Sequence, residues 1–351
     1  MGQVVVFQQP RVVTIEHEPE KALGPKDVRL RTLYSGISAG TEMSAYRGTN
    51  PAILKQWDLS RRLFVPSESP SQSYPLAGWG YEEVGQVVEA GSEVQAVRPG
   101  DFIYGIWGHR TEQVVTEEYA AKRLLPAGLD PVLGIFSHIG PIAINGVHDA
   151  AIRIGETVAV FGLGVLGQAV AQLAKKSGAR VVGVDTIARR LQMGLDTGAL
   201  DAAFHPAEGS PAEQIKALTG GLGADVSIEV SGSTRALQEA IRSTAYSSRV
   251  VALGFFQGEA HGLYLGEEFH HNRVSIISSQ ISGSAAELSY RWNRERLIQT
   301  TMRLQVEGLL NLRPLITHVV PFEQAAEAFR LLDEHPADAL QVVLSFEPAA
   351  R

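Results

Sequence analysis

The pattern of apolar and polar positions is typical of β-strands over residues 1–142. Short segments alternate between apolar and polar residues and are separated by Gly and Pro, which is how strands with one buried face read. The predicted strands in this region are Val4–Phe7, Val12–Glu16, Val28–Leu33, Glu83–Ala90, Phe102–Ile106 and Gln113–Thr116. We therefore predict a β-rich domain over residues 1–142.

Residues 143–284 follow a different pattern, in which strands and amphipathic helices alternate every 20–25 residues or so. The predicted strands are Val158–Phe161, Arg180–Val184, Ala202–His205, Val226–Val230, Val250–Leu253 and Val274–Ser278. The predicted helices include Leu166–Ser177, Ala188–Thr197, Pro211–Leu218 and Thr234–Ser243. Strands joined by right-handed helical crossovers form a parallel sheet, so this region predicts a six-stranded, doubly wound α/β domain.

Residues 285–351 contain a helix from Arg294 to Glu307, a strand over Leu315–Val320, a helix over Phe322–Asp333 and a strand over Gln341–Phe346. A closing strand after an α/β block indicates that the chain returns to the first domain.

Two stretches fit neither pattern. Thr49–Ser73 contains Trp57 and adjacent arginines, and Gly258–Arg273 contains three histidines. Connections this long are either surface excursions or walls of a binding site.

The segment Val158–Asp185 carries the clearest motif in the chain. A strand leads into Gly162-x-Gly164-x-x-Gly167, the helix Leu166–Ser177 follows, and a second strand ends at Asp185. Val165 and Leu166, within the glycine motif, are further candidate cofactor-binding residues. In such a unit the glycines allow a tight turn, close approach of a pyrophosphate and close helix packing. The free N–H groups of the helix attract phosphate, and the acid can bind a ribose diol. The unit predicts a nicotinamide dinucleotide site.

The acid at the second strand favours NAD over NADP, because a carboxylate repels a 2′-phosphate. Arg190 follows closely and could instead pair with that phosphate or pack on adenine. The nicotinamide half is expected at the carboxyl ends of the strands, where the loops containing Ser231 and Gly232, and Gly254 and Phe255, lie.

Composition narrows the class of protein. The chain has 351 residues, a net charge of -7 and no cysteine. No basic run invites nucleic acid, and no apolar stretch approaches the ~18 residues of a membrane span. The start lacks the pattern of a signal peptide, so a cytoplasmic enzyme acting on a small molecule is expected. Without cysteine there is no thiolate zinc site.

The chain resembles the medium-chain dehydrogenase/reductase superfamily, in its zinc alcohol dehydrogenase-like group, over nearly its whole length. The matching segments are Val28–Gly36, Gly80-Tyr81-Glu82, Pro99-Gly100-Asp101, the dinucleotide unit and Leu315–Phe322. Ser35–Glu42 and the Gly-Tyr-Glu triplet are similar to the branch containing bacteriochlorophyllide hydroxyethyl dehydrogenases. The resemblance implies a GroES-like catalytic domain, a Rossmann domain, and hydride transfer in a cleft between them. It also implies a homodimer joined near Val274–Ser279.

The chain departs from that family where zinc would bind. The positions matching the three zinc ligands hold Ser38 or Ala39, Tyr81 and His138. A hydroxyl and a phenol are poor zinc ligands, so no zinc is expected. An alternative nitrogen and oxygen site, built from His109 and His138 with Glu82 or Glu42, stays open at this point.

Without zinc, hydrogen-bond donors must stabilise the substrate oxygen. The resemblance places Tyr81 where a zinc-binding histidine would point and Thr41 at a proton-relaying hydroxyl. His138 is the candidate titrating group, and Glu82 is a further candidate. Each of these residues could instead have a purely structural role. The candidate substrate-binding residues are Ser38, Glu42, Trp57 and His109.

The sequence therefore predicts a zinc-independent, NAD-preferring dehydrogenase acting on a secondary alcohol or its ketone, such as a polyol, a sugar or a bulky substrate. One alternative is a zinc-free NADPH-dependent quinone or enoyl reductase. Another is a dinucleotide-binding protein without catalytic activity.

Overall fold

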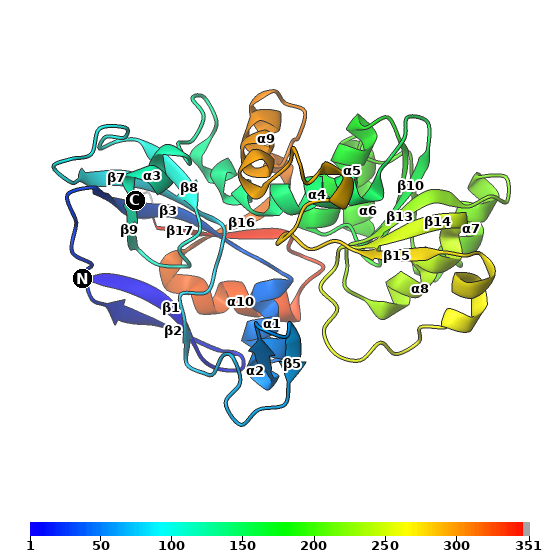
Figure 1. Ribbon diagram of the computed structural model, residues 1–351, viewed down its shortest axis with the longest axis horizontal. Coiled ribbons are helices and arrows are strands. Elements are labelled where there is room, and N and C mark those ends of the chain that lie inside the picture. The colour runs from blue at the N-terminus through cyan, green and yellow to red at the C-terminus, as the bar shows by residue number, and fades with distance from the viewer. Residues whose placement is uncertain (347–351) are drawn as a thin grey trace. The chain divides into compact units, whose positions relative to one another are not determined.

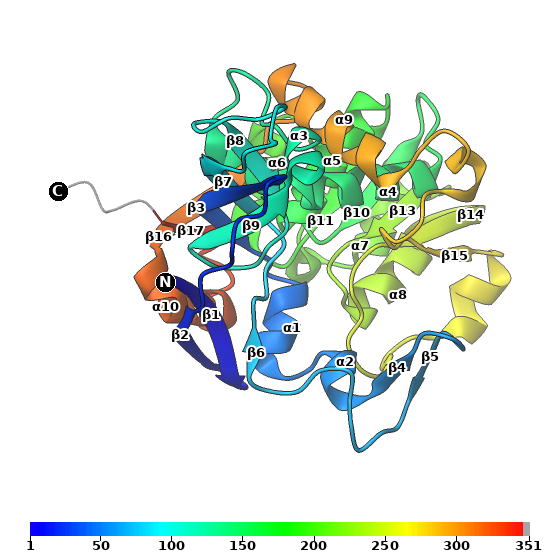
Figure 2. The same cartoon turned by 60° about the vertical axis from the view of Figure 1, so that its left-hand side comes forward.

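The computed structural model describes residues 1–346 and divides the chain into two compact units. Unit 1 contains Met1–His138 and the segment from Leu312 onward, and unit 2 contains Ile139–Asn311. The return of the chain to the first unit agrees with the order of elements read from the sequence. Figures 1 and 2 show the elements of each unit.

Unit 1 is built from β-sheets whose strand pairs are antiparallel, apart from the parallel pair of β16 and β17. Its first segment holds β1 (Gly2–Gln9), β2 (Val12–Glu18), β3 (Asp27–Ile37), α1 (Thr41–Arg47), α2 (Pro51–Leu54), β4 (Gln56–Asp58), β5 (Leu63–Val65), β6 (Leu76–Ala77), β7 (Glu83–Ala90), β8 (Phe102–Gly105), β9 (Glu112–Thr116), α3 (Glu117–Ala121) and the 3₁₀ helix η1 (Pro131–Ser137). The returning segment adds η5 (Arg313–Leu315), β16 (Ile316–Pro321), η6 (Phe322–Gln324), α10 (Ala325–Glu334) and β17 (Gln341–Ser345).

The main sheet of unit 1 has the order β16-β17-β3-β7-β8, with β9 also paired to β3. The returning strand β17 runs antiparallel to β3, so residues 300 positions apart in sequence become neighbours, as Val342 and Ile37 do. A three-stranded sheet, β2-β1-β6, packs through Phe7 against Phe329 of α10. The polar residues of the candidate site lie where β3 ends and β7 begins.

Unit 2 is a parallel sheet of order β12-β11-β10-β13-β14-β15. Its strands are β10 (Thr157–Phe161), β11 (Arg180–Val184), β12 (Ala202–Phe204), β13 (Ala224–Glu229), β14 (Thr244–Ala252) and β15 (Ser275–Ser278). Its helices are α4 (Ile139–Ala150), α5 (Val165–Lys176), α6 (Ala188–Asp196), α7 (Pro211–Leu218), α8 (Thr234–Ser243) and α9 (Arg294–Val306), with short helical turns η2 (Pro206–Glu208), η3 (Leu265–Phe269) and η4 (Ala286–Leu288).

Helices α4, α5 and α6 lie on one face of this sheet, and α7 and α8 lie on the other (Figure 1). The predicted α/β class, with a six-stranded Rossmann sheet beside a β-rich GroES-like unit, is confirmed. In the central strand β10, the side chains of Val158–Phe161 are fully buried, as expected for a parallel sheet covered on both faces.

The predicted domain limits need correction. The expected changes of domain after residues 142 and 284 lie instead after His138 and Asn311. Helix α9 belongs to unit 2 because it packs on α4. The two helices are in close contact, since a Cβ at Gly140 of α4 would lie 2.1 Å from Thr301 of α9. Gln172 of α5 also bonds both the N–H and the carbonyl of Asn311. An amphipathic helix read alone does not reveal which core its apolar face will join.

Candidate functional site

Three residues that match zinc-ligand positions come together in unit 1. The Tyr81 hydroxyl donates to Ser38 Oγ, and the rings of Tyr81 and His138 lie 4.5 Å apart between centroids. The Thr41 hydroxyl also forms a hydrogen bond with Tyr81. The structure therefore assembles a group of two hydroxyls, a phenol and an imidazole, which we call the Tyr81 group (Ser38, Thr41, Tyr81 and His138).

Local backbone geometry explains why these residues meet. Ser38 follows the end of β3, and Thr41 begins α1 after the turn at Gly40. Gly80, directly before Tyr81, has φ of 121°, a conformation that favours glycine. A side chain there would also lie 2.8 Å from the Glu83 carboxylate. The packing of this turn against Glu83 and the Gly108–His109 segment thus depends on a residue without a Cβ.

Behind the Tyr81 group lies a chain of fully buried polar residues. His109 Nε2 lies 2.5 Å from Glu42 Oε2, and His109 Nδ1 lies 2.6 Å from Ser35 Oγ. Ser35 donates to Glu83 Oε1 at 3.1 Å, since the two residues are paired directly across β3 and β7. The Trp107 N–H donates to the other Glu83 oxygen at 2.7 Å.

These partners assign both protons of His109. Because Ser35 uses its single proton toward Glu83, His109 Nδ1 must donate to Ser35. Because Glu42 is an acceptor, Nε2 must also donate, which makes His109 an imidazolium. Burial alone would lower the pKa of His109, but the carboxylates of Glu42 and Glu83 raise it overall.

Glu82 is the remaining acid of this region and has no exposed surface. Neither of its carboxyl oxygens makes a hydrogen bond within the structure. Burial, together with Glu42 and Glu83, raises the pKa of Glu82 well above its usual range, with the Gln341 amide opposing. Glu82 is therefore a neutral acid, and Gly36 makes room for it, since a Cβ there would lie 2.4 Å from Glu82 Oε2.

The predicted substrate contacts of Glu42 and His109 need correction, because neither side chain has any exposed surface. They bond each other instead. Of the alternative metal-site residues, His109 has both ring nitrogens in hydrogen bonds, with Ser35 and with Glu42. Across residues 1–346, no three His, Asp or Glu side chains are grouped so as to hold a metal ion.

Trp57 is separate from the Tyr81 group. It lies on β4, in the hairpin that β4 and β5 form beyond α2 (Figure 2), and its ring packs on Phe64 with centroids 4.8 Å apart. Its side chain is 40% exposed. The long Thr49–Ser73 segment is thus an ordered excursion of unit 1 that carries an aromatic pair on its surface.

In unit 2 the three glycines of the motif after β10, two in the loop and Gly167 in α5, meet different surroundings. Gly162 has φ of 91°, and a Cβ there would lie 2.7 Å from Ser231. A Cβ on Gly167 would lie 1.9 Å from the Gly162 carbonyl oxygen. A Cβ on Gly164 would meet only the Arg190 guanidinium, at 4.0 Å. The first and third glycines are needed for packing, and the second leaves open space in front of the N-terminus of α5.

Asp185 braces this loop. Its Oδ2 accepts the Leu163 N–H at 2.6 Å, and its Oδ1 accepts the Ile187 N–H at 2.8 Å. Each carboxylate oxygen has a second lone pair, so the side chain can still accept from a ribose diol. The Arg190 guanidinium lies 4.0 Å from Asp185 Oδ2.

Glu229 is a site residue that the sequence reading missed. It ends β13, and its carboxylate accepts from the backbone N–H groups of Ser231 and Gly232 and from the Ser231 hydroxyl. Its carbonyl accepts from the N–H of Gly254, where a Cβ would lie only 2.2 Å from Gly232 N. Glu229 therefore joins the two loops that hold the predicted residues Ser231, Gly232, Gly254 and Phe255. The signal that could have identified Glu229 in the sequence is an acid directly before Val-Ser-Gly at the end of a strand.

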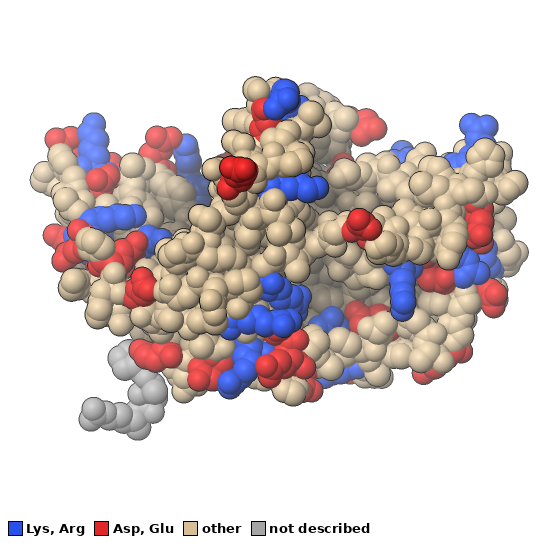
Figure 3. Space-filling model, turned by 90° about the horizontal axis from the view of Figure 1, so that it is seen from below, with Lys and Arg blue, Asp and Glu red and all other residues tan. Residues whose placement is uncertain are grey.

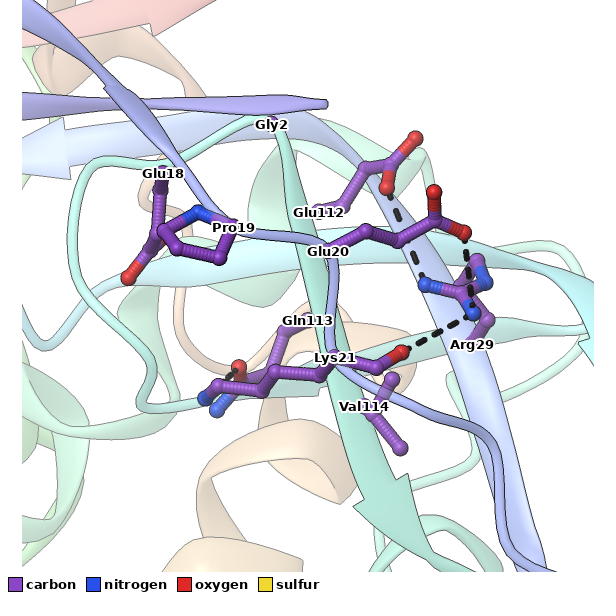
Figure 4. A pocket seen from close by; sticks show the side chains of 9 residues that line it. All are labelled: Gly2, Glu18, Pro19, Glu20, Lys21, Arg29, Glu112, Gln113 and Val114. Carbon is purple, nitrogen blue, oxygen red and sulfur yellow. Dashed lines mark hydrogen bonds and ion pairs between the residues drawn. The ribbon is translucent and has the colours of Figure 1, made fainter.

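The hollow around Arg29 and the charged surface of residues 1–346 do not indicate a second candidate site. The hollow drawn in Figure 4 surrounds Arg29, whose guanidinium is paired with Glu20, Glu89 and Glu112. These pairs brace the edge between β3 and β9. On the face drawn in Figure 3, basic and acidic residues are interspersed in small groups. None of the helices within residues 1–346 has the length and apolar character that crossing a bilayer requires.

The donors of the Tyr81 group do not fit zinc. Ser38 and Tyr81 are bonded to each other, and burial, with Glu82 and Glu42, raises the pKa of the Tyr81 phenol. A protonated phenol and a hydroxyl are not ligands that Zn²⁺ prefers, and only His138 is of the usual type. We derive no step through a metal.

A GroES-like unit joined to a Rossmann unit is the architecture of a medium-chain dehydrogenase. Residues 165–295 match the family model described as zinc-binding dehydrogenase. The chain is 32% identical to the D-guloside 3-dehydrogenase of Escherichia coli K12 over 349 residues, covering 97% of this chain and 99% of the relative. It is 26% identical to the 2-desacetyl-2-hydroxyethyl bacteriochlorophyllide A dehydrogenase of Rhodobacter capsulatus, covering 99% of each.

Solved structures share the fold. A zinc-binding dehydrogenase of Sinorhizobium meliloti 1021 bound to NADP has a TM-score of 0.77 at 20% identity, covering 98% of this chain and 99% of that one. An alcohol dehydrogenase of Escherichia coli CFT073 complexed with NADH has a TM-score of 0.75 at 20% identity, with the same coverage. The chain belongs to the medium-chain dehydrogenase/reductase superfamily, and it is an oxidoreductase.

The glycine surroundings predict opposite effects of two matched substitutions. Gly164→Ala should leave the thermal unfolding midpoint unchanged but weaken NADH binding about tenfold, or about 1.4 kcal/mol, because the methyl group enters the open space. Gly167→Ala should destabilise the protein by about 1–3 kcal/mol, because its methyl group meets backbone. Calorimetry and NADH fluorescence measure the two effects. Equal destabilisation by both variants would contradict the assignment.

Glu229 predicts a pH dependence of stability. Burial raises its pKa to about 7, against the lowering effect of its hydrogen bonds. The folded state therefore holds this proton more tightly than the unfolded state, so the stabilisation is present below about pH 4.5 and is lost as the pH rises toward 7. The loss amounts to about 3 kcal/mol. In Glu229→Gln the unfolding midpoint should vary less between pH 5 and 8 than in the wild type, and an unchanged slope would contradict this.

Proposed function

We propose that this chain is a zinc-independent, NAD-dependent dehydrogenase that interconverts a secondary alcohol of a sugar or polyol and the corresponding ketone. The observation that carries the proposal is the Tyr81 group: at the three positions matching zinc ligands, Ser38 and Tyr81 are hydrogen-bonded and the His138 ring lies against Tyr81. The relative of 32% identity is named as acting at position 3 of a D-guloside, which supports a ring hydroxyl as the reacting group.

Bound NAD would supply the hydride acceptor for the carbinol hydrogen. The residues of this chain then handle the oxygen and its proton. The raised pKa of Tyr81 keeps its hydroxyl protonated near neutral pH. When substrate binds, Ser38 donates its own proton to the Tyr81 oxygen, and the phenol proton is donated to the substrate oxygen. An imidazole exchanges a proton in this pH range, so His138 accepts the proton that leaves the alcohol.

Ser38 and Thr41 hold the Tyr81 hydroxyl from two sides. This fixes the position of the Tyr81 oxygen before substrate arrives, which is the condition under which a single donor contributes most to the rate. Glu82 is buried beside Tyr81, and its raised pKa gives it no direct part in proton transfer near neutral pH.

Unit 2 supplies the dinucleotide site. The open space at Gly164 suits the pyrophosphate, Asp185 suits the ribose diol, and the loops joined by Glu229 suit the nicotinamide half. We further propose a homodimer joined along β15, since in the described part of the chain this strand pairs only with β14.

Removal of the Tyr81 hydroxyl tests the proton chemistry. Tyr81→Phe should lower kcat about 100-fold, because a preorganised donor is lost, while the Kd for NADH stays unchanged. The assay is NAD reduction with a panel of methyl glycosides and polyols. Tyr74→Phe is the matched control, because it removes a phenol hydroxyl that bonds only the Ala45 carbonyl in the same unit.

Assays on the purified wild-type protein distinguish the proposed dehydrogenase from a quinone or enoyl reductase and from a binding protein without activity. Elemental analysis should find less than stoichiometric zinc, and chelation should leave kcat unchanged. Turnover of quinones or enones with NADPH, and not of alcohols with NAD, would show the reductase instead. NADH binding without turnover of any substrate would show a binding protein.

Cofactor choice is tested at Asp185 and Arg190. The wild type should prefer NAD to NADP in kcat/KM, and Asp185→Asn should reduce that preference about tenfold by removing the charge that repels a 2′-phosphate. Arg190→Ala separates the two roles of the arginine. If Arg190 packs on adenine, both cofactors bind more weakly to the same extent, and if it pairs with a phosphate, only NADP is affected.

A further inference from the structure

Burying the polar chain behind the Tyr81 group costs free energy, because its charged residues lose their contact with water. Glu42, Glu83 and His109 have no exposed surface, although at least one carboxylate and the imidazolium are charged. Removing such charges from water costs about as much as their attraction returns, so a buried pair of this kind adds little net stability. A role in holding geometry accounts for it better than a role in stability.

The geometry leads from this chain directly to the Tyr81 group. Glu42 Oε2 is held by His109, and Glu42 Oε1 accepts the Ser38 N–H at 2.9 Å. Ser38 Oγ in turn accepts from the Tyr81 hydroxyl. Glu42 is thus the one residue that bonds both the imidazolium and the backbone of the residue that orients Tyr81.

The far side of His109 is equally fixed. Ser35 and Glu83 hold Nδ1 from paired strands, and the ring lies edge-on to Phe329 with centroids 5.8 Å apart. The His109 backbone is tied to two further segments, through Val5 N–H and the Trp79 carbonyl. The imidazolium therefore has one orientation, and it transmits that orientation to Glu42.

We propose that Glu42 and His109 are a positioning pair that fixes the Ser38 turn and, through it, the place of the Tyr81 hydroxyl beside the oxygen of a secondary alcohol. The inference rests on the proposed function for its effect on rate. The placement of Ser38 by Glu42 is a separate physical claim and can be measured without turnover.

The test removes the acceptor and then restores it. Glu42→Ala should lower kcat about 100-fold, as expected for a displaced reacting group, with the Kd for NADH unchanged. Glu42→Gln keeps an oxygen for the Ser38 N–H and should recover kcat to within about tenfold of the wild type. Ser35→Ala, a milder change at the far side of His109, should lower kcat by a smaller factor.

A double-mutant cycle shows whether the pair acts through Tyr81. In the Tyr81→Phe background, Glu42→Ala should lower kcat by less than about threefold, because the hydroxyl that it positions is already gone. Equal effects in both backgrounds would overturn the proposal. Val97→Ala is the control for general destabilisation, since this buried residue packs in a different core cluster and should lower the melting temperature without changing kcat.

Amide hydrogen exchange separates this inference from the proposed function. Peptides covering residues 36–43 should exchange faster in Glu42→Ala than in the wild type and Val97→Ala, whatever the substrate. Unchanged exchange in folded Glu42→Ala would overturn the positioning pair while leaving the proposed function intact. Unchanged kcat in Tyr81→Phe would overturn the proposed proton chemistry, and faster exchange would still support the placement of Ser38 by Glu42.

Discussion

The arrangement of unit 1 depends on one buried cation. Glu42, Glu82 and Glu83 meet where β3 ends and β7 begins, and three carboxylates cannot all be ionised there without a positive charge beside them. His109 supplies that charge to Glu42 and, through Ser35, to Glu83. Glu82 is left without a partner and takes up a proton. The distribution of charge in this core follows from which acids the single imidazolium can reach.

Much of the fold follows from the sequence because its signals are local. The alternating strands, the periodic helices and the glycine loop each depend on residues within one segment, and helices Pro211–Leu218 and Thr234–Ser243 have the predicted limits. The convergence of Ser38, Tyr81 and His138 was also within reach, because all three match positions of one known site. The boundary at Asn311 was not, because it depends on α9 packing against α4.

The parts of the site that the sequence did not reveal are those that depend on pairing between distant segments. Ser35 and Glu83 bond because β3 and β7 place them opposite each other, and nothing local marks either residue. His109 was expected near a substrate, yet it lies in the interior, since Glu42 and Ser35 receive both its protons. Glu229 was overlooked because its significance lies in the two loops it joins.

The same contacts indicate that a single substitution would not give this chain a zinc-type ligand set. A histidine at position 81 would bring an imidazole to the Tyr81 group, but a hydroxyl at Ser38 would still stand where a thiolate or imidazole is needed. Glu42 would also be poorly suited to orient that histidine, because it is already bonded to His109 and to the Ser38 N–H. A metal-binding imidazole depends on such an orienting partner. Tyr81, Ser38 and the Glu42–His109 pair therefore form one interdependent arrangement, in which each residue suits hydrogen bonding and none can be exchanged alone for metal binding.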